Sequence, residues 1–287
     1  FKLFYMNYSA DIKKTERHFL PADFAISNWE TLEPYFIELA EKEIKSAGDL
    51  EKWMKDAGEL EAAVSEDACW RQIRMTCDTE NKALEEAFTF FVMEIQPKVQ
   101  PYADKLNRKL AASPFLKELN QGKYFTYLRT VKKNIELFRP ENISIQAELN
   151  VSQQQFGVIS AKMMIAVAGK EYTLQQASKF LENPDRKLRE TVYRKIGDRR
   201  LADKGILNDL FSNLLGKRNR EALNAGFQNF RDYKFKELGR FDYTKNECQQ
   251  FHEAVKLHIL PLVDEIYKQK KEKLGVDVLK PWDTEAQ

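Results

Sequence analysis

The sequence lacks any long apolar run. No stretch approaches the roughly 18 to 20 apolar residues that a membrane-spanning helix requires. The apolar start, FKLFYMNY, is short, contains Lys2 and leads into the charged DIKKTERH, whereas a signal peptide ends in a small-residue cleavage site. These absences predict a protein that is neither embedded in a membrane nor exported, and we expect it in the cytoplasm.

Cysteine is also scarce. Cys69, Cys77 and Cys248 are three in number, an odd count. Cys69 and Cys77 lie eight positions apart in a helical pattern, which is roughly 12 Å along a helix axis and too far for a disulfide bond. The cysteines therefore indicate a reducing compartment.

Histidine is equally rare, and its spacing does not suit a metal site. His18, His252 and His258 are the three histidines, and none lies in an H-E-x-x-H motif. On a helix His252 and His258 would project about 240° apart, nearly on opposite faces. Cys248 and His252 do share a face, but two ligands do not complete a zinc site. We interpret that pair as polar neighbours on a partly buried helix face.

The common catalytic and phosphate-binding motifs are missing as well. The sequence contains no G-x-S-x-G, C-x-x-C, G-x-x-x-x-G-K-[ST] or G-x-G-x-x-G. Lys and Arg total 46 against 44 for Asp and Glu, a formal charge of +2 with both signs interleaved. This balance argues against a nucleic-acid partner, which requires a clustered basic face. The basic run EIYKQKKEKLG is typical of a solvated helix C-terminus.

What the sequence does contain is helical periodicity in a chain long enough for one large domain or two ordinary ones. The segment SNWETLEPYFIELAEKEI predicts a helix capped by Ser27 or Asn28 and ended by Gly48. A second helix is expected from residue 49 to about 77, interrupted near Gly58. The helical pattern continues after residue 78.

Prolines and one apolar run mark the next elements. Pro97 and Pro101 predict a kink or a break, and Ser113 followed by Pro114 predicts a helix start. The segment AKMMIAVAGKEYTL at 161–174 alternates around an AGKE turn and predicts a small β-hairpin.

Capping signals locate three helices in the second half of the chain. Thr173 with Gln176, and Thr244 with Glu247, form capping boxes, and Asn183-Pro184-Asp185 predicts a helix start. An apolar stripe follows, in which Leu188, Val192 and Ile196 recur at four-residue spacing. We expect the stripe to be extended by Leu207, Phe211, Leu214 and Leu215. Pro261 predicts a kink in the last long helix. The expected domain boundary lies near residue 183, which separates 1–183, ending in the hairpin and a short helix, from the long helices of 184–287.

The connector 224–244, NAGFQNFRDYKFKELGRFDYT, is dense in rings and charge, with six aromatic and seven charged residues among 21. As a helix it places apolar rings and cations on one arc, so the pattern is not cleanly amphipathic. Either the rings anchor two helices in a core, which we favour, or they form one wall of a ligand groove. Gly226 and Gly239 are expected to be turns that bracket this connector.

Several segments in order resemble the oligoendopeptidase F branch of the thimet-oligopeptidase-like zinc metallopeptidases. The family pattern A-G-[FY]-x-[NS]-[FY]-x-[DE]-[FY] is met at residues 225–233, and the segment FHEAVKLHILPLVDEIYKQKKEKLGVDVLKPWD that follows the connector is also similar. Upstream, GKEYTLQQASKFLENPDRKLRETVYRK resembles the family hairpin and its DR-x-x-R helix, with Asp185, Arg186 and Arg189 in place. The segment EDACWRQIRMTCDTENKALEEAFTFFVMEIQPKV is similar to the N-terminal helices of this branch.

This resemblance implies a mainly α, multi-helix, two-lobed peptidase that cleaves short peptides in an internal channel. It implies a zinc ion held by two histidines of H-E-x-x-H and a downstream glutamate, with the glutamate of that motif as general base for the zinc-bound water. This sequence contains no such motif. We therefore expect the zinc ligands outside this chain, no catalytic or metal-binding residue within it, and no peptidase activity from it alone.

Two interpretations follow. The first is the N-terminal half of a peptidase, which supplies channel wall and scaffold and has short peptides and its own C-terminal catalytic half as partners. The second is a helical binding or scaffold protein without catalysis. We favour the first, and the reading frame beyond Gln287 distinguishes them. Substrate-contacting residues stay unassigned, although Arg240 and Tyr243 lie beside the ring cluster where the channel side is expected.

Overall fold

The computed structural model describes residues 16–286. It is 75% helical and contains a two-stranded antiparallel sheet, so the predicted mainly α class with a small hairpin is confirmed. The apolar start at residues 1–8 lies outside the described residues. Within residues 16–286, no helix combines the length and the apolar character that a membrane crossing needs.

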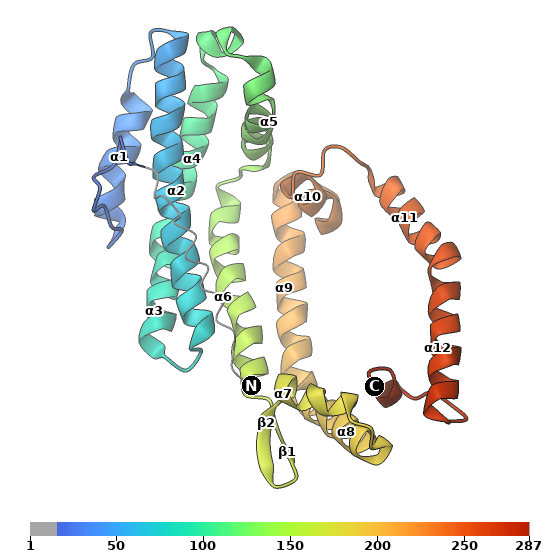
Figure 1. Ribbon diagram of the computed structural model, residues 1–287. Helices are drawn as coiled ribbons and strands as arrows, with labels where there is room; N and C mark the ends of the chain where they lie inside the picture. Colours follow the sequence, from blue (N-terminus) through green and yellow to red (C-terminus); the bar gives the residue numbers. More distant parts are fainter. Residues whose placement is uncertain (1–15, 287) are drawn as a thin grey trace.

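The chain begins with an up-and-down bundle of helices (Figure 1). Its members are α1 (Trp29–Glu41), α2 (Ala47–Cys77), α3 (Lys82–Phe90), α4 (Gln96–Ala111) and α5 (Gln121–Leu137). Leu32, Phe36 and Leu39 recur at helical spacing on α1 and are buried in the core of this bundle. Buried Trp53 on α2 belongs to the same core, and its indole N–H donates to the Leu39 carbonyl over 2.8 Å. One apolar core therefore joins the first five helices.

The first helix ends earlier than the sequence predicted. Asn28 caps α1 as expected, but α1 ends at Glu41, and Ser46 caps α2 so that Gly48 lies inside α2. The Lys109 ammonium donates to the carbonyl oxygens of Leu39, Ala40 and Lys42, which satisfies the exposed end of α1 without a glycine cap. The prediction that Gly48 ends the helix was wrong because a distant lysine performs that role.

The predicted interruption near Gly58 was also wrong. The helix α2 runs unbroken through Gly58 to Cys77, with Trp53 and Leu60 buried on either side of it in sequence. A glycine costs a helix only about 1 kcal/mol relative to alanine. The buried residues that flank Gly58 stabilise the helix by more than this cost.

The two prolines near residue 100 alter helix geometry without breaking the rod. A π-helical turn, η1 (Phe91–Ile95), links α3 to α4. Pro97 lies in the first turn of α4, where its missing N–H is tolerated, and Pro101 lies inside α4. The predicted kink or break thus takes the form of a π turn just before Pro97.

After α4 the predicted helix start at Ser113-Pro114 is only partly correct. Pro114 begins a short 3-10 turn, η2 (Pro114–Glu118). The next α-helix, α5, begins later because the Asn120 side chain accepts a hydrogen bond from the Lys123 amide. The Ser113-Pro114 pair thus starts a 3-10 turn, and Asn120 caps the α-helix that follows.

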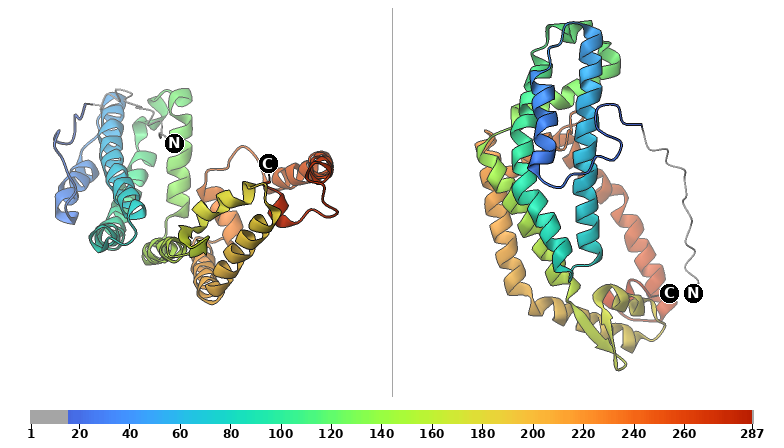
Figure 2. Two further views of the ribbon diagram at one scale, coloured as in Figure 1. Left: turned by 60° about the horizontal axis from the view of Figure 1, so that its bottom comes forward. Right: turned by 90° about the vertical axis from the view of Figure 1, so that its left-hand side faces the viewer.

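The hairpin follows α6 (Glu141–Ala161), the helix that leads out of the bundle (Figure 1). Strands β1 (Met164–Val167) and β2 (Lys170–Thr173) pair antiparallel with Val167 opposite Lys170. The two turn residues, Ala168 and Gly169, have φ values of 50° and 81°, which suit the right-handed twist of a two-residue hairpin turn. The hairpin lies at one end of the molecule, where it packs against the next two α-helices of the chain (Figure 2).

The predicted caps after the hairpin are confirmed. Both sides of the Thr173–Gln176 capping box form at α7 (Leu174–Ser178), which continues into the 3-10 turn η3 (Lys179–Glu182). Asp185 caps α8 (Arg186–Ala202), accepting from the amides of Lys187 and Leu188. Val192 and Ile196 are buried against the hairpin and α7, as the first part of the stripe predicted.

The stripe does not continue as one face. The helix α8 ends at Ala202, and α9 (Lys204–Asn224) starts a new axis. Leu210 and Leu214 pack against α6, whereas Phe211 and Leu215 stay exposed. The prediction of a continuous stripe was wrong because the break at Asp203 resets the direction of the helix faces.

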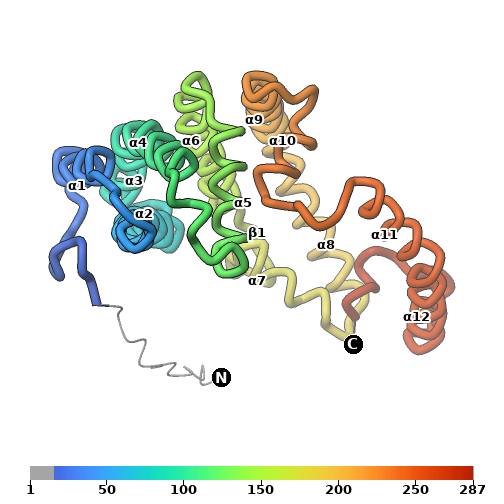
Figure 3. The backbone as a smooth tube through the Cα atoms, turned by 90° about the horizontal axis from the view of Figure 1, so that it is seen from above, coloured from blue at the N-terminus to red at the C-terminus, as the bar shows by residue number. Residues whose placement is uncertain are grey.

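The last helices form an arm that leaves the rest of the molecule. After α10 (Phe230–Glu237), α11 (Lys245–His258) begins at the predicted Thr244–Glu247 capping box. The predicted kink at Pro261 is a break at Ile259, beyond which α12 (Leu260–Leu274) begins. The chain then returns through η4 (Pro281–Asp283) toward α8. Seen from above, the helices form an open curved row from α1 to α12 (Figure 3).

Candidate functional site

The three histidines do not converge on a metal site. His18, His252 and His258 are all exposed, and Cys248 is partly buried. Among residues 16–286, no group of three or more His, Cys, Asp or Glu side chains is placed to hold a metal ion. Cys248 and His252 therefore have no third ligand within the described part of the chain.

The connector 224–244 is held mainly by its rings. Asn229 caps α10, and Gly226 and Gly239 adopt φ values of 86° and 66°, so the predicted bracketing turns are confirmed. Tyr233 is buried, and Phe227 packs edge-on against it with ring centroids 5.6 Å apart. The connector thus anchors α9 and α10 to the end of α5, where Leu137 joins the same core.

Beneath these rings lies a buried polar network. The Glu221 carboxylate on α9 accepts from the Tyr233 hydroxyl over 3.1 Å and from the Gln146 amide over 2.8 Å. The Asn142 amide donates to the Glu221 carbonyl over 2.9 Å. Burial raises the pKa of Tyr233, and the neighbouring charge of Glu221 raises it further. Tyr233 therefore stays protonated and serves as a hydrogen-bond donor to Glu221.

At the rim of the connector, cations lie against rings. The Arg129 guanidinium lies 4.4 Å from the centroid of the Phe241 ring and donates to Asp242 over 2.9 Å. Arg240 and Tyr243 are exposed, and each packs on Phe235. Neither lines the groove described next, so the expected position of Arg240 and Tyr243 beside a binding channel stays a prediction.

The groove runs along α6 and consists of two adjoining hollows. The first, of about 460 Å³, lies between α6 and the segment from α2 to η1. The second, of about 530 Å³, lies between α6, α9 and α10. Gln96, Asn150 and Gln153 line both hollows, so the two adjoin at these residues.

Carboxamides are the commonest polar side chains in the lining of this groove, and its second hollow also has charged residues from α9 and α10. Six of them face it: Gln72, Gln96, Gln146, Asn150, Gln153 and Gln154. We call the two hollows with these residues the amide groove. Four of the six come from α6, where Gln146, Asn150, Gln153 and Gln154 recur at the three- and four-residue spacing of one helix face.

The groove is not predictable from the sequence as a whole, although part of its signal is present there. Asn142, Gln146, Asn150 and Gln154 form a polar stripe at four-residue spacing, and α6 also packs against the bundle through Ala147 and against α9 through Leu149. A polar stripe is usually read as a solvated face. Only the packing of α2, η1 and α10 around α6 turns this stripe into a groove.

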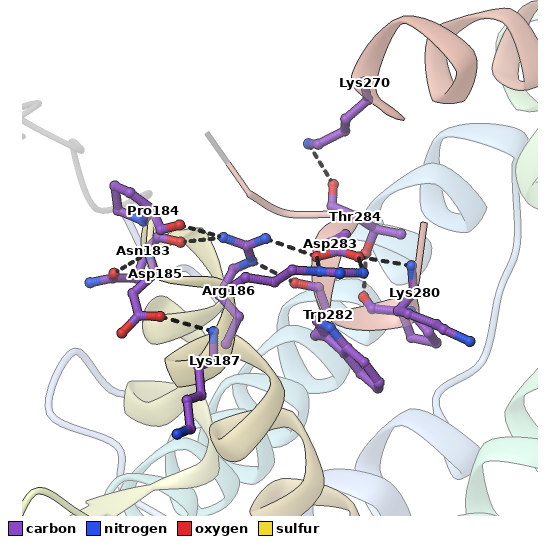
Figure 4. Close-up of polar contacts among 12 residues, drawn as sticks. Asn183, Pro184, Asp185, Arg186, Lys187, Lys270, Lys280, Trp282, Asp283 and Thr284 are labelled. Carbon is purple, nitrogen blue, oxygen red and sulfur yellow. Dashed lines mark hydrogen bonds and ion pairs between the residues drawn. The ribbon is translucent and has the colours of Figure 1, made fainter. Parts of the chain in front are cut away.

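A second polar cluster fixes the end of the arm. The Asp283 side chain is fully buried, accepts from Arg186 at both oxygens over 3.1 and 2.8 Å, and accepts from Arg189 over 2.8 Å. The Lys280 backbone N–H donates to the same carboxylate over 2.9 Å (Figure 4). Burial alone would raise the pKa of Asp283, but these hydrogen bonds outweigh it and lower the pKa to about 2.

Arg189, in the first turn of α8, completes this cluster. It is buried and donates to the carbonyl oxygens of Asn183, Pro184 and Trp282. The arginines of the DR-x-x-R motif thus bind the residues that follow the arm, 97 and 94 positions later in the chain. The cluster ties η4 to α8.

In comparisons with known proteins, two family models match the chain, and both describe the same peptidase family. The family model described as the peptidase M3 N-terminal domain matches residues 19–138, and the model described as peptidase family M3 matches residues 179–287. No curated protein sequence gives a match.

Solved structures give a consistent result. A protein named as an oligoendopeptidase F shares 26% identity with a TM-score of 0.85, and the match covers 91% of this chain and 46% of that one. PZ peptidase A with an inhibitor shares 25% identity with a TM-score of 0.84, over 91% of this chain and 47% of that one. An oligoendopeptidase F from Bacillus anthracis shares the fold, with 23% identity, a TM-score of 0.85 and coverage of 94% and 50%. This chain spans about half the length of these proteins.

Proposed function

This chain belongs to peptidase family M3, in its oligoendopeptidase F branch, and from that premise we propose that it is the non-catalytic N-terminal portion of a zinc-dependent oligopeptidase. The complete enzyme hydrolyses short peptides in an internal channel. This segment supplies channel wall and scaffold and no catalytic group.

One observation carries the proposal. Two models of the same peptidase family match in chain order, at 19–138 and 179–287, in a chain whose described residues hold no metal-binding cluster. This combination supports a segment of the family whose metal site lies outside the chain.

The residues present do not fit the zinc that the family uses. A catalytic zinc takes three protein ligands, and throughout residues 16–286 Cys248 and His252 have no third partner. We therefore propose that the zinc ligands lie outside this chain, and we assign no step of the hydrolysis to its residues.

The amide groove supports the channel-wall part of the proposal. It runs along α6 between the bundle and α10, and the connector fixes α10 at one side of it through the buried Tyr233–Glu221 pair. The function of the connector is thus to position α10, since its rings hold this wall of the groove in place.

The exposed surface of the arm, α11 and α12, supports the proposal that a catalytic half is the partner of this chain. No residue of α11 or α12 is buried, and both expose large apolar side chains, among them Phe251, Leu257, Leu262 and Ile266. Exposed apolar surface of this extent marks an interface. We propose that the catalytic half covers it, in agreement with the share of the relatives' length that this chain spans.

Two smaller proposals follow from the sequence. The boundary near residue 183 separates a first domain, 1–183, from the first helices of the peptidase lobe, 184–287. The three cysteines are free thiols, which supports the expected reducing, cytoplasmic location.

The proposal is tested by expressing this chain together with the coding sequence that follows Gln287. We expect that protein to cleave a quenched fluorescent peptide of about ten residues and to lose this activity with a zinc chelator. If the extended protein binds peptides but does not cleave them, the alternative of a non-catalytic helical binding protein replaces the peptidase.

A further inference from the structure

The amide groove has the polar groups of a peptide-binding site, with no charged residue in the lining of its first hollow and two charges of each sign in its second. We propose that the amide groove binds about five residues of extended peptide through hydrogen bonds to the peptide backbone, independently of the side chains of the peptide. This proposal rests on the proposed function. The ligand class is therefore an uncharged stretch of main chain.

The side chains that line the groove can form hydrogen bonds with peptide groups. A carboxamide has two N–H donors and one carbonyl acceptor, so it can pair with a peptide group in both directions. Within residues 16–286, the side chains of Gln72, Gln153 and Gln154 form no hydrogen bond to another protein group. These three are free to pair with a ligand.

Two other carboxamides are held in place by their neighbours. Gln146 accepts from Gln100 over 3.0 Å while donating to Glu221 over 2.8 Å, and the Asn150 amide donates to Gln96 over 3.4 Å. Each still has a donor or a lone pair unused. Side chains fixed before binding lose less entropy when a ligand arrives.

The distribution of charged residues in the groove disfavours a charged ligand group. The hollow between α6 and the segment from α2 to η1 has no charged residue in its lining, in a chain of which 31% of residues are charged. Its floor is apolar, built from buried Met75, Phe88, Phe91 and Val92. A charged ligand group would lose hydration there without finding a counter-charge.

The second hollow is lined by two basic and two acidic residues, which are Arg218, Lys234, Glu221 and Glu237. Lys234 pairs with Glu237, and Glu221 is satisfied by Gln146 and Tyr233. Arg218 lies over the Phe230 ring, 5.7 Å from its centroid. This hollow therefore offers little net attraction for either sign of charge.

Groove length sets the length of the ligand. Gln146 and Val158 line the two ends of the stretch along α6, and their separation is roughly 18 Å at the rise of an α-helix. An extended peptide advances about 3.3 Å per residue. The groove therefore holds about five residues.

The test is a titration of the 287-residue chain, without zinc, with an N-acetylated and C-amidated pentapeptide of alanine and glycine. Side-chain ¹⁵N NMR follows the carboxamides directly, and the signals of Gln146, Asn150, Gln153 and Gln154 are assigned by single substitutions. We expect these signals to shift on titration. A peptide whose central amides are replaced by esters should bind about threefold to tenfold more weakly, since it lacks backbone donors.

Two variants on the same helix sharpen the test. Gln153→Leu removes a free carboxamide from the groove and should weaken binding about threefold to tenfold. Gln155→Leu is the control, because Gln155 is exposed on α6 and does not line the groove; its affinity should be unchanged.

Absence of shifts, or equal binding of the ester peptide, overturns the proposal. Because the titration uses no zinc, it is independent of the peptidase assay. A complete enzyme that fails to cleave would overturn the proposed function while leaving binding to the groove intact.

Discussion

The buried carboxylate of Asp283 pairs with Arg186 and Arg189. Asp283→Asn keeps the shape but leaves buried Arg189 without its carboxylate, and an uncompensated buried charge costs about 3 to 5 kcal/mol. We expect a loss in the free energy of unfolding of about 3 kcal/mol, measured by urea denaturation. Glu285→Gln is the matched control, since exposed Glu285 should change stability by less than about 0.5 kcal/mol.

The pH dependence of the same residue has a definite sign. The pKa of Asp283 is lowered to about 2 in the folded protein, against about 3.9 in an unfolded chain. Its contribution to stability is therefore complete above about pH 4 and is lost as the pH falls toward 2. The difference in unfolding free energy between the native protein and Asp283→Asn should shrink over that interval; a difference that stays constant would contradict the account.

At the scale of elements, two glycines should respond to alanine with opposite signs. Gly169 has a φ of 81° in the hairpin turn, where a side chain is strained, so Gly169→Ala should destabilise by about 1 kcal/mol or more. Gly58 is exposed inside α2, and an added Cβ would meet no atom within 4 Å. Gly58→Ala should stabilise by about 0.5 to 1 kcal/mol. Thermal unfolding measures both, and changes of equal sign would refute the assignment of these two positions.

The elements also show what the sequence could predict. The caps at Asp185, Thr173 and Thr244 were predictable because each depends on residues within three positions. The end of α1 was not, because Lys109 reaches it from 67 or more positions away. The amide groove likewise needs three segments around α6, and the partner of the DR-x-x-R arginines is Asp283, far along the chain.

For the whole molecule, the arm should behave as an uncovered interface. Replacing Phe251 and Leu262 together with lysine removes apolar surface that is 67% and 61% exposed. We expect lower binding of a hydrophobic dye and less self-association by light scattering, with an unfolding temperature within about 2 °C of the native value, since no buried contact is lost. A large fall in that temperature would show that the arm packs within this chain.

The central claim is that this chain provides a peptide-binding wall and no catalytic group. The most direct test is the cleavage of a quenched fluorescent peptide by the purified 287-residue chain with excess zinc. We predict no turnover above the rate of buffer with zinc. Turnover that a chelator stops and that Cys248→Ala with His252→Ala abolishes would contradict the account, because it would place a working metal site within this chain.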